Sequence, residues 1–251
     1  MATLEEDTVI YVSSSNVPTT QDKSKIEIVL STPLTLSEAT NFEAAVLKIQ
    51  YPANYNNVTE GHIDYYSHTL QKRVYTRIAD GYYPDAESFM KAFQKVLGND
   101  SKHYQLTYVS NSKFFLIQLQ GGNKSSIHLS ENLTRLCGLP KKINGEGFHK
   151  ADSAWDGTGG NSTLNVLCNI ISLIYINDTK KPLILSMSYG AGQKAEGQIQ
   201  YEPQNPIYIP LNDRQIKQIT MNLQNEHGQP FPFVSSATTI TLHVRPASPR
   251  I

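Results

Sequence analysis

Apolar and polar residues alternate along most of the chain, and this period of two is typical of β-strands with one buried face. In residues 25–30, Ile26, Ile28 and Leu30 share one side of the predicted strand. Residues 42–52 begin with a stretch that is apolar on both sides, as expected of a strand covered on both faces. Further strands are predicted at 73–78, 114–120, 166–176, 219–224 and 240–245.

The last two of these strands close the chain and are the most regular. Their apolar positions are Ile219, Met221, Leu223, Ile240, Leu242 and Val244. Between them, residues 225–230 (NEHGQP) supply the glycine and proline of a turn. We therefore predict that the two strands form a hairpin and that this hairpin belongs to the main sheet structure.

Two segments have helical patterns. In residues 84–97, Phe89 and Phe93 begin a series of apolar positions four residues apart, with acidic residues early and lysines late. A shorter helix is predicted to start at Ser130, a suitable N-cap, and to end at Gly138. Many short strands with regular turn signals and one or two short helices predict an all-β sandwich or barrel.

No internal repeat and no linker divides residues 1–251, so the sequence predicts a single domain. The composition changes only at residues 141–163, which are glycine-rich, polar and aperiodic and contain Trp155, the one tryptophan of the chain. We predict that this segment is a long surface loop inserted between strands, mobile or ordered by a partner.

Charge is balanced, with 22 basic and 22 acidic residues, which removes the general electrostatic argument for nucleic acid or an anionic membrane. The longest apolar stretch, around residues 165–176, is too short and too polar to span a bilayer. The N-terminal residues lack a basic region followed by an apolar run, so we expect no secretory signal. Low charge suits a protein that packs against copies of itself, and it suits an ordinary neutral domain equally well.

Residues that could carry chemistry are scattered. Cys137 and Cys168 each lie in an apolar stretch and are predicted to be buried, free thiols in a reducing compartment. The seven histidines show no metal-ligand spacing, and His243, on the polar side of the last strand, is predicted to be a solvated or interface residue. Residues 190–195 (GAGQKA) match a dinucleotide-binding string, but an extended segment follows them, which favours a turn. We predict no catalytic, cofactor-binding or metal-binding residues and no enzyme activity.

Tyrosine is abundant, with 14 residues, several of them in adjacent pairs. Tyrosine combines apolar area with a polar tip and is favoured at protein–protein contacts and in sugar or nucleic-acid sites. It is also common in strands for packing reasons alone. The sequence leaves both interpretations open.

Four stretches, in order, resemble the penton, or minor capsid, proteins of the Polinton/Maverick, adintovirus and virophage group. The first combines a strand, a Pro-Leu-x-Leu link, an apolar strand, Tyr-Pro and an aromatic-Asn-Asn-Val end. Its residues here are Pro33, Leu34, Leu36, Tyr51, Pro52, Tyr55, Asn56, Asn57 and Val58. The family often has tryptophan where Tyr55 stands. The second stretch is Gly81, Tyr82 and Tyr83 followed by an amphipathic helix.

The third stretch is the short helix SENLTRLCGLP together with the later segment CNIISLIYINDTKKPLILSM. The matching residues of that segment are Asp178, Thr179, Pro182 and Leu183. The segment just before them, IYIN, is shorter than the corresponding segment in the family. The fourth is the end of the chain, with its Thr-Leu-His-Val-Arg strand at 241–245. The resemblance covers nearly the whole chain except residues 141–163.

This resemblance implies a single jelly-roll β-sandwich of two antiparallel sheets with short helices in its loops. It implies that the chain forms a homopentamer at each fivefold vertex of an icosahedral capsid built from a double-jelly-roll major capsid protein. The partners would then be further copies of the chain and that major capsid protein, and the loop at 141–163 could contact a receptor or spike. The expected location is the virion, after synthesis in the host cytoplasm or nucleus, with no cofactor and no specific nucleic acid.

Two other functions fit the same residues. A jelly-roll binding module, lectin-like or similar to a trimeric ligand, would share the fold class and the tyrosine content, although it usually carries a signal peptide or anchor. An enzyme on a β-sandwich is the second alternative, but no carboxylate pair or metal set in the sequence supports it.

Overall fold

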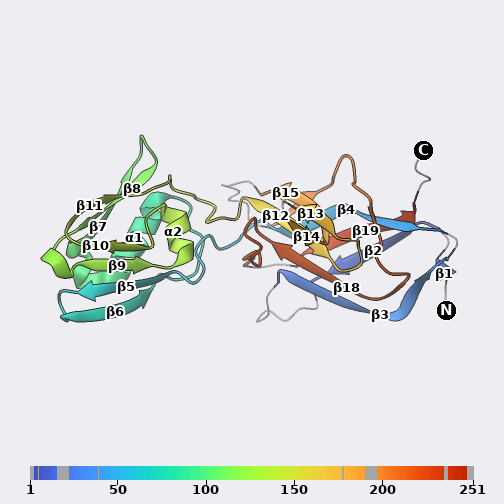
Figure 1. The fold of residues 1–251 in the computed structure, drawn as a ribbon, viewed down its shortest axis with the longest axis horizontal. Coiled ribbons are helices and arrows are strands. Elements are labelled where there is room, and N and C mark those ends of the chain that lie inside the picture. Colours follow the sequence, from blue (N-terminus) through green and yellow to red (C-terminus); the bar gives the residue numbers. More distant parts are fainter. Residues whose placement is uncertain are drawn as a thin grey trace. The chain divides into compact units, whose positions relative to one another are not determined.

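The computed structural model of the chain describes residues 3–4, 6–15, 23–38, 40–176, 178–189, 197–234 and 237–247 (Figure 1). The chain divides into two compact units. Unit 1 consists of Met1–Tyr55 and Thr163–Ile251, and unit 2 consists of Asn56–Ser162. Unit 2 buries a hydrophobic core of its own. The single domain expected from the sequence stays a prediction.

The described part of unit 1 contains two large sheets and a separate two-stranded one. In order, the first has β2 (Thr8–Ser13), β19 (Thr239–Pro246), β4 (Phe42–Pro52) and β16 (Gln198–Tyr201), and β17 (Ile209–Pro210) also pairs with β4. The second has β1 (Thr3–Leu4), β3 (Lys25–Leu36), β18 (Gln215–Gln224), β12 (Thr163–Cys168) and β15 (Leu183–Ser188). All neighbours are antiparallel except β1, which runs parallel to β3.

The strand pairing of unit 1 is that of a jelly roll. Of its eight main strands, the first along the chain (β2) pairs with the last (β19), and the second (β3) pairs with the seventh (β18). The third (β4) pairs with the sixth (β16), and the fourth (β12) pairs with the fifth (β15). These pairings describe a long hairpin wrapped around one core, which confirms the all-β jelly-roll sandwich expected from the sequence.

The predicted buried faces of unit 1 are confirmed, but the predicted closing hairpin is wrong. The six alternating apolar residues of β18 and β19 are buried, as is Ile26 of β3. However, β18 pairs with β3 and β12, whereas β19 pairs with β2 and β4, so the two strands lie in different sheets. The connection crosses between the sheets at Asn225, whose side-chain oxygen accepts hydrogen bonds from the backbone N–H groups of His227 and Gln229, both at 3.0 Å.

The long strand predicted at 166–176 is also wrong, because the chain turns at Asn169. The Asn169 side-chain oxygen accepts a hydrogen bond from Thr220 N at 2.7 Å, and its Nδ2 donates to Gln218 O at 3.1 Å. The Asn169 side chain thus occupies backbone groups of β18 that would otherwise pair with a continuation of β12. The strand therefore ends at Cys168. A separate hairpin of β13 (Ile174–Ile176) and β14 (Thr179–Lys181) follows.

Unit 2, inserted between β4 and β12 along the chain, has two smaller antiparallel sheets. One has β10 (Lys142–Asn144), β9 (Ser126–Leu129), β5 (His62–Ser67) and β6 (Lys72–Arg77) in order. The other has β11 (Gly147–Lys150), β8 (Phe114–Leu119) and β7 (Tyr104–Val109). Both helices predicted from the sequence are confirmed, as α1 (Ala86–Leu97) and α2 (Glu131–Cys137). Short 3-10 helices lie at η1 (Gly98–His103) and η2 (Gly122–Lys124).

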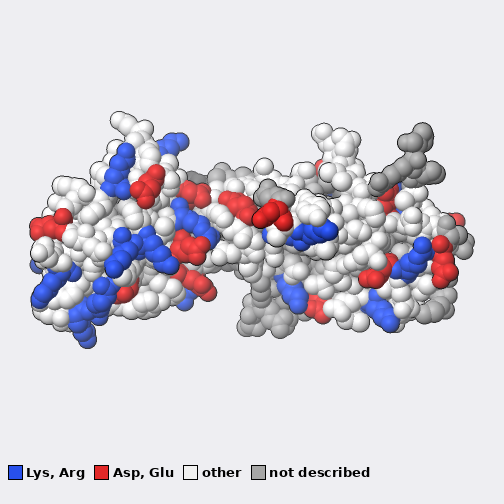
Figure 2. Space-filling model, in the orientation of Figure 1, with Lys and Arg blue, Asp and Glu red and all other residues white. Residues whose placement is uncertain are grey.

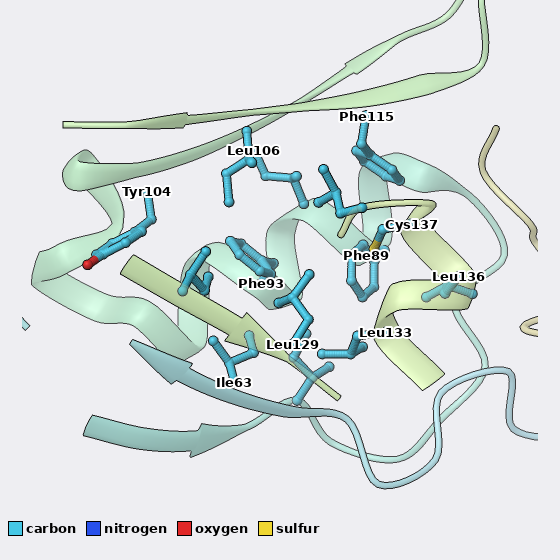
Figure 3. Close-up of a cluster of buried hydrophobic side chains, with 14 of the residues drawn as sticks. Ile63, Phe89, Phe93, Tyr104, Leu106, Phe115, Leu129, Leu133, Leu136 and Cys137 are labelled. Carbon is cyan, nitrogen blue, oxygen red and sulfur yellow. The ribbon is translucent and has the colours of Figure 1, made fainter. Parts of the chain in front are cut away.

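The core of unit 2 joins these elements. Figure 3 shows Phe89 and Phe93 from α1 among side chains of α2 and of strands from both sheets, pointing toward one another. Asp85 caps α1 by accepting a hydrogen bond from Ser88 N at 2.8 Å. Gly138 ends α2 in the left-handed conformation, with φ of 68°, and a Cβ there would lie 2.1 Å from Ser153 O. Only glycine fits this position.

The segment 141–163 is not the surface loop that its composition predicts. Its strand β10 pairs with β9, and β11 pairs with β8. Trp155 packs against Phe89 and Phe115, with ring centroids 5.5 and 5.4 Å apart. The segment was missed because its strands are only three and four residues long, too short to display a period.

Candidate assembly surfaces

The jelly roll of unit 1 has two side edges, each formed by strands of both sheets. On one side, β15 and β16 are the last strands of their sheets, and we call this the β15–β16 edge. On the other side lie β2 and, for most of its length, β3, and we call this the β2–β3 edge.

The β15–β16 edge leaves an apolar groove of about 240 Å³ between the two sheets. Its walls include Val46, Ile174, Leu185, Tyr201, Ile207 and Ile209. Ile207 is 74% exposed, whereas Ile209, two residues later, is buried. The two sheets therefore do not close over their own apolar side chains on this side of unit 1.

The β2–β3 edge also exposes apolar side chains, but on flat strand surfaces. Tyr11 and Val9 lie on the outer side of β2, and Tyr11 is 71% exposed. Val29 lies on the outer side of β3 and is 73% exposed. Among the residues that the structure describes, β2 pairs only with β19, so its other side is open to a further strand. The two edges of unit 1 thus differ, because one has a groove between the sheets and the other has apolar side chains on the outer faces of β2 and β3.

His243 lies on the outer face of β19, as predicted, where it is partly exposed. Its Nδ1 lies 2.7 Å from the Tyr208 hydroxyl and its Nε2 lies 3.4 Å from Asp7 Oδ2. The Arg245 guanidinium lies over the Tyr208 ring, 3.4 Å from the centroid, and Arg245 pairs with Glu43 at 2.8 Å. These contacts link the side chains on the outer face of the sheet beside the β2–β3 edge into one network.

A broad cleft of about 1020 Å³ lies at the end of unit 1 where β4 begins. Its lining combines apolar residues such as Phe42 with the charged residues Glu43, Asp213, Arg214 and Arg245. Three of these groups already serve the fold, because Arg245 pairs with Glu43 and Arg214 donates from Nη1 to Ser37 O at 2.8 Å. Arg245 and Glu43 therefore offset each other's charge in the cleft.

The two cysteines are buried and free, as predicted. Burial raises the pKa of the Cys137 thiol well above its ordinary value and raises the pKa of Cys168 to about 11. Thiols with raised pKa values are poor nucleophiles.

Within the described ranges, no three His, Cys, Asp or Glu side chains are grouped to hold a metal ion. No helix among those residues is long and apolar enough to cross a membrane. Residues 190–195, predicted as a turn, lie outside the described residues.

Several residues that carry the sequence resemblance have structural roles. Asn57 is fully buried in unit 2, where its Nδ2 donates to Tyr83 O at 2.8 Å and Gly157 O at 3.0 Å. Its Oδ1 accepts from Tyr83 N at 2.8 Å. In unit 1, buried Tyr55 packs edge-on against Tyr189, with centroids 5.1 Å apart. The tyrosines thus divide between core positions such as these and exposed ones such as Tyr11.

The sequence did not single out Ile207, Tyr11 or Val29 as surface residues. Val29 gave a weak signal, because it adds an apolar residue to the polar side of an otherwise alternating strand. Ile207 sits in an irregular segment, where no period shows which side is buried.

Comparison with known proteins gave one kind of match. No family model matches the chain, and no curated protein sequence matches it. Among solved structures, the crystal structure of selenomethionine-labelled mavirus penton protein is similar, with a TM-score of 0.44 and 11% sequence identity. The overlap covers 97% of this chain and 100% of that chain. A likeness this distant carries no argument about function.

Proposed function

We propose that the chain is a minor capsid protein of the penton type. Five copies form a ring at each vertex of an icosahedral capsid whose faces consist of a double-jelly-roll major capsid protein. The fold alone does not establish this function, because jelly rolls also occur in lectins and other proteins. The observation that carries the proposal is the presence of two different uncovered apolar surfaces on opposite edges of the jelly roll.

Two different surfaces on one chain favour a ring. A contact between the groove of one copy and the projecting edge of the next is heterologous, and such contacts generate a closed ring when the rotation closes. In this proposal the β15–β16 groove receives apolar side chains from the β2–β3 edge of the neighbouring copy. Burial of Ile207 and Tyr11 there would remove apolar area that each copy otherwise exposes to water.

The resemblance in sequence supports the same function independently of the edges. Its stretches fall on β3, β4, β15 and β19 of the jelly roll and on the start, α1 and α2 of unit 2. The residues that it shares include Asn57, which joins two segments of unit 2 far apart in sequence. The resemblance therefore concerns both the jelly roll and the inserted unit.

The test uses one substitution on each edge. Ile207→Glu and Tyr11→Glu each place a charge where the proposal buries an apolar side chain, and an unpaired buried charge costs several kcal/mol. Phe148→Glu is the matched control, because Phe148 is an equally exposed apolar residue on β11 of unit 2. Light scattering on a sizing column measures the mass of each purified variant.

We expect each edge variant to be a monomer and the control to keep the mass of the unmodified chain. When the two edge variants are mixed, each retains one intact edge, so we expect heterodimers that cannot extend into rings. A mixture that restores full rings, or edge variants that assemble as well as the control, would refute the head-to-tail contact. A trimer in the unmodified chain would favour the alternative, a jelly-roll binding module similar to a trimeric ligand.

A further inference from the structure

A second surface of interest lies on unit 2, on the outer face of the sheet β6–β5–β9–β10. Alternation along each strand turns the apolar side chains Ile63, Tyr65, Ile127 and Ile143 into the core. The opposite face carries Arg73, Tyr75 and Arg77 on β6, Asp64 on β5, His128 on β9 and Lys142 on β10. This outer face, which we call the basic sheet face, combines cations with aromatic rings.

The register of the strands brings these side chains together. Tyr75 lies opposite Asp64, Asp64 lies opposite His128, and His128 lies opposite Lys142, so one row crosses all four strands. In the next row Arg73 lies opposite Tyr66. Side chains directly opposite one another in a sheet are close enough to act on one ligand.

The acidic groups of this face are already paired. Asp64 accepts a hydrogen bond from Arg73 Nε at 3.0 Å and pairs with Arg73 Nη2 at 2.8 Å. Asp80, beside the face, pairs with Arg77 at 2.6 Å. Among the described residues, Lys142 and Lys124 form no ion pair with an acidic side chain. The basic sheet face therefore has an excess of positive charge.

The face is open to solvent, and basic side chains gather over the region of β5, β6, β9 and β10 in Figure 2. Tyr75 is 65% exposed, and its ring is stacked on His62 with centroids 5.1 Å apart and planes 29° apart. Lys124 Nζ lies 5.9 Å from the Tyr66 ring. Stacking holds the Tyr75 ring in place, so that it offers an ordered apolar surface among the charged groups.

We propose that the basic sheet face binds a sulfated polysaccharide. Sulfate groups match Lys142 and Lys124, which can make charge-assisted hydrogen bonds to them. The ring of Tyr75 offers a flat apolar surface to the C–H face of a sugar.

The centre of the face adds groups that can bind sugar hydroxyls. Asp64 lies between the cations and is paired with Arg73, and its remaining lone pairs can accept hydrogen bonds from sugar hydroxyls. Ser126 and Asn144, in the row beside it, add hydroxyl and amide groups that can do the same. The combination fits a ligand that carries both anionic groups and many hydroxyls. It does not depend on the assembly state of unit 1.

The experiment measures binding of a heparin octasaccharide to the full chain by isothermal titration calorimetry at physiological salt. The same octasaccharide without its sulfates tests the charge requirement. Lys142→Ala removes one cation from the face, and Lys95→Ala is its matched control, because Lys95 is an exposed lysine on α1 of the same unit. Tyr75→Ala removes the proposed sugar platform. The fluorescence of Trp155 checks that each variant keeps the folded core of unit 2.

We expect the sulfated octasaccharide to bind and the desulfated one not to bind. Lys142→Ala and Tyr75→Ala should each weaken binding roughly three- to tenfold, and Lys95→Ala should leave it unchanged. Three results overturn the proposal: no binding, equal weakening by Lys95→Ala and Lys142→Ala, or equally tight binding of a single-stranded oligonucleotide with the same charge. The last result would assign the face to nucleic acid.

Discussion

Trp155 makes it possible to test whether the two units have independent cores. It is the only tryptophan of the chain and packs against Phe89 and Phe115, so its fluorescence reports the core of unit 2. Ile127 on β9 of unit 2 and Ile240 on β19 of unit 1 are both fully buried. Ile127→Val and Ile240→Val therefore make the same chemical change at equal burial, one in each unit.

The expected loss follows from the burial. Each substitution removes one buried methylene group, and Ile→Val at such positions lowers the free energy of unfolding by roughly 0.5–1.5 kcal/mol. In a unit of about 100 residues, a loss of about 1 kcal/mol lowers the melting temperature by about 4–8 °C. A shift of that size is readily measured by thermal unfolding.

The assay follows thermal unfolding by Trp155 fluorescence and by far-UV circular dichroism on the same samples. We expect Ile127→Val to lower the transition seen by fluorescence. Ile240→Val should leave that transition unchanged and lower a transition that only circular dichroism detects. If Ile240→Val lowers the fluorescence transition as much as Ile127→Val does, the cores unfold together and the reasoning from separate cores fails.

Three further predictions concern unit 2. Asn57→Ala leaves the backbone groups of Tyr83 without their buried partner and should cost about 1–3 kcal/mol in urea unfolding followed by Trp155 fluorescence. Burial, followed by neighbouring positive charge, lowers the pKa values of His68 and His128, so both favour their neutral forms in the fold. Their contribution to stability should be complete above their ordinary pKa of about 6.5 and should fall as the pH drops below it, which urea titrations across pH 5–8 would detect as a loss toward acid. Gly138→Ala should lower the melting temperature because a Cβ would clash with Ser153 O, and an unchanged value would show that the α2 C-terminus adapts.

The buried faces of strands could be predicted because each has one apolar side. Ile26, Ile219 and Ile240 lie in the core as their alternation indicates. The partner of each strand could not be predicted, since β18 and β19 look like a hairpin but pair with strands from the other end of the chain. The division into two units escaped prediction for the same reason, because alternation marks a residue as buried without saying in which core.

Local polar groups account for other failures. Asn169 ends β12 by a side-chain hydrogen bond, which interrupts a sequence that reads as one long apolar strand. The candidate surfaces depend on which apolar side chains are exposed. The sequence does not distinguish exposed Ile207 from buried Ile209, because both are isoleucines in the same short segment. Only the arrangement of strands shows which apolar side chains remain uncovered.

The central claim is that the chain assembles into a ring of five at a capsid vertex. The most direct measurement is light scattering of the unmodified chain on a sizing column, with negative-stain images of the same peak, alone and after co-expression with a double-jelly-roll major capsid protein. The account predicts a mass of five times the 28.0 kDa of the chain with fivefold rings, or shells that carry the chain at their vertices. A stable trimer, or shells whose vertices lack the chain, would contradict it.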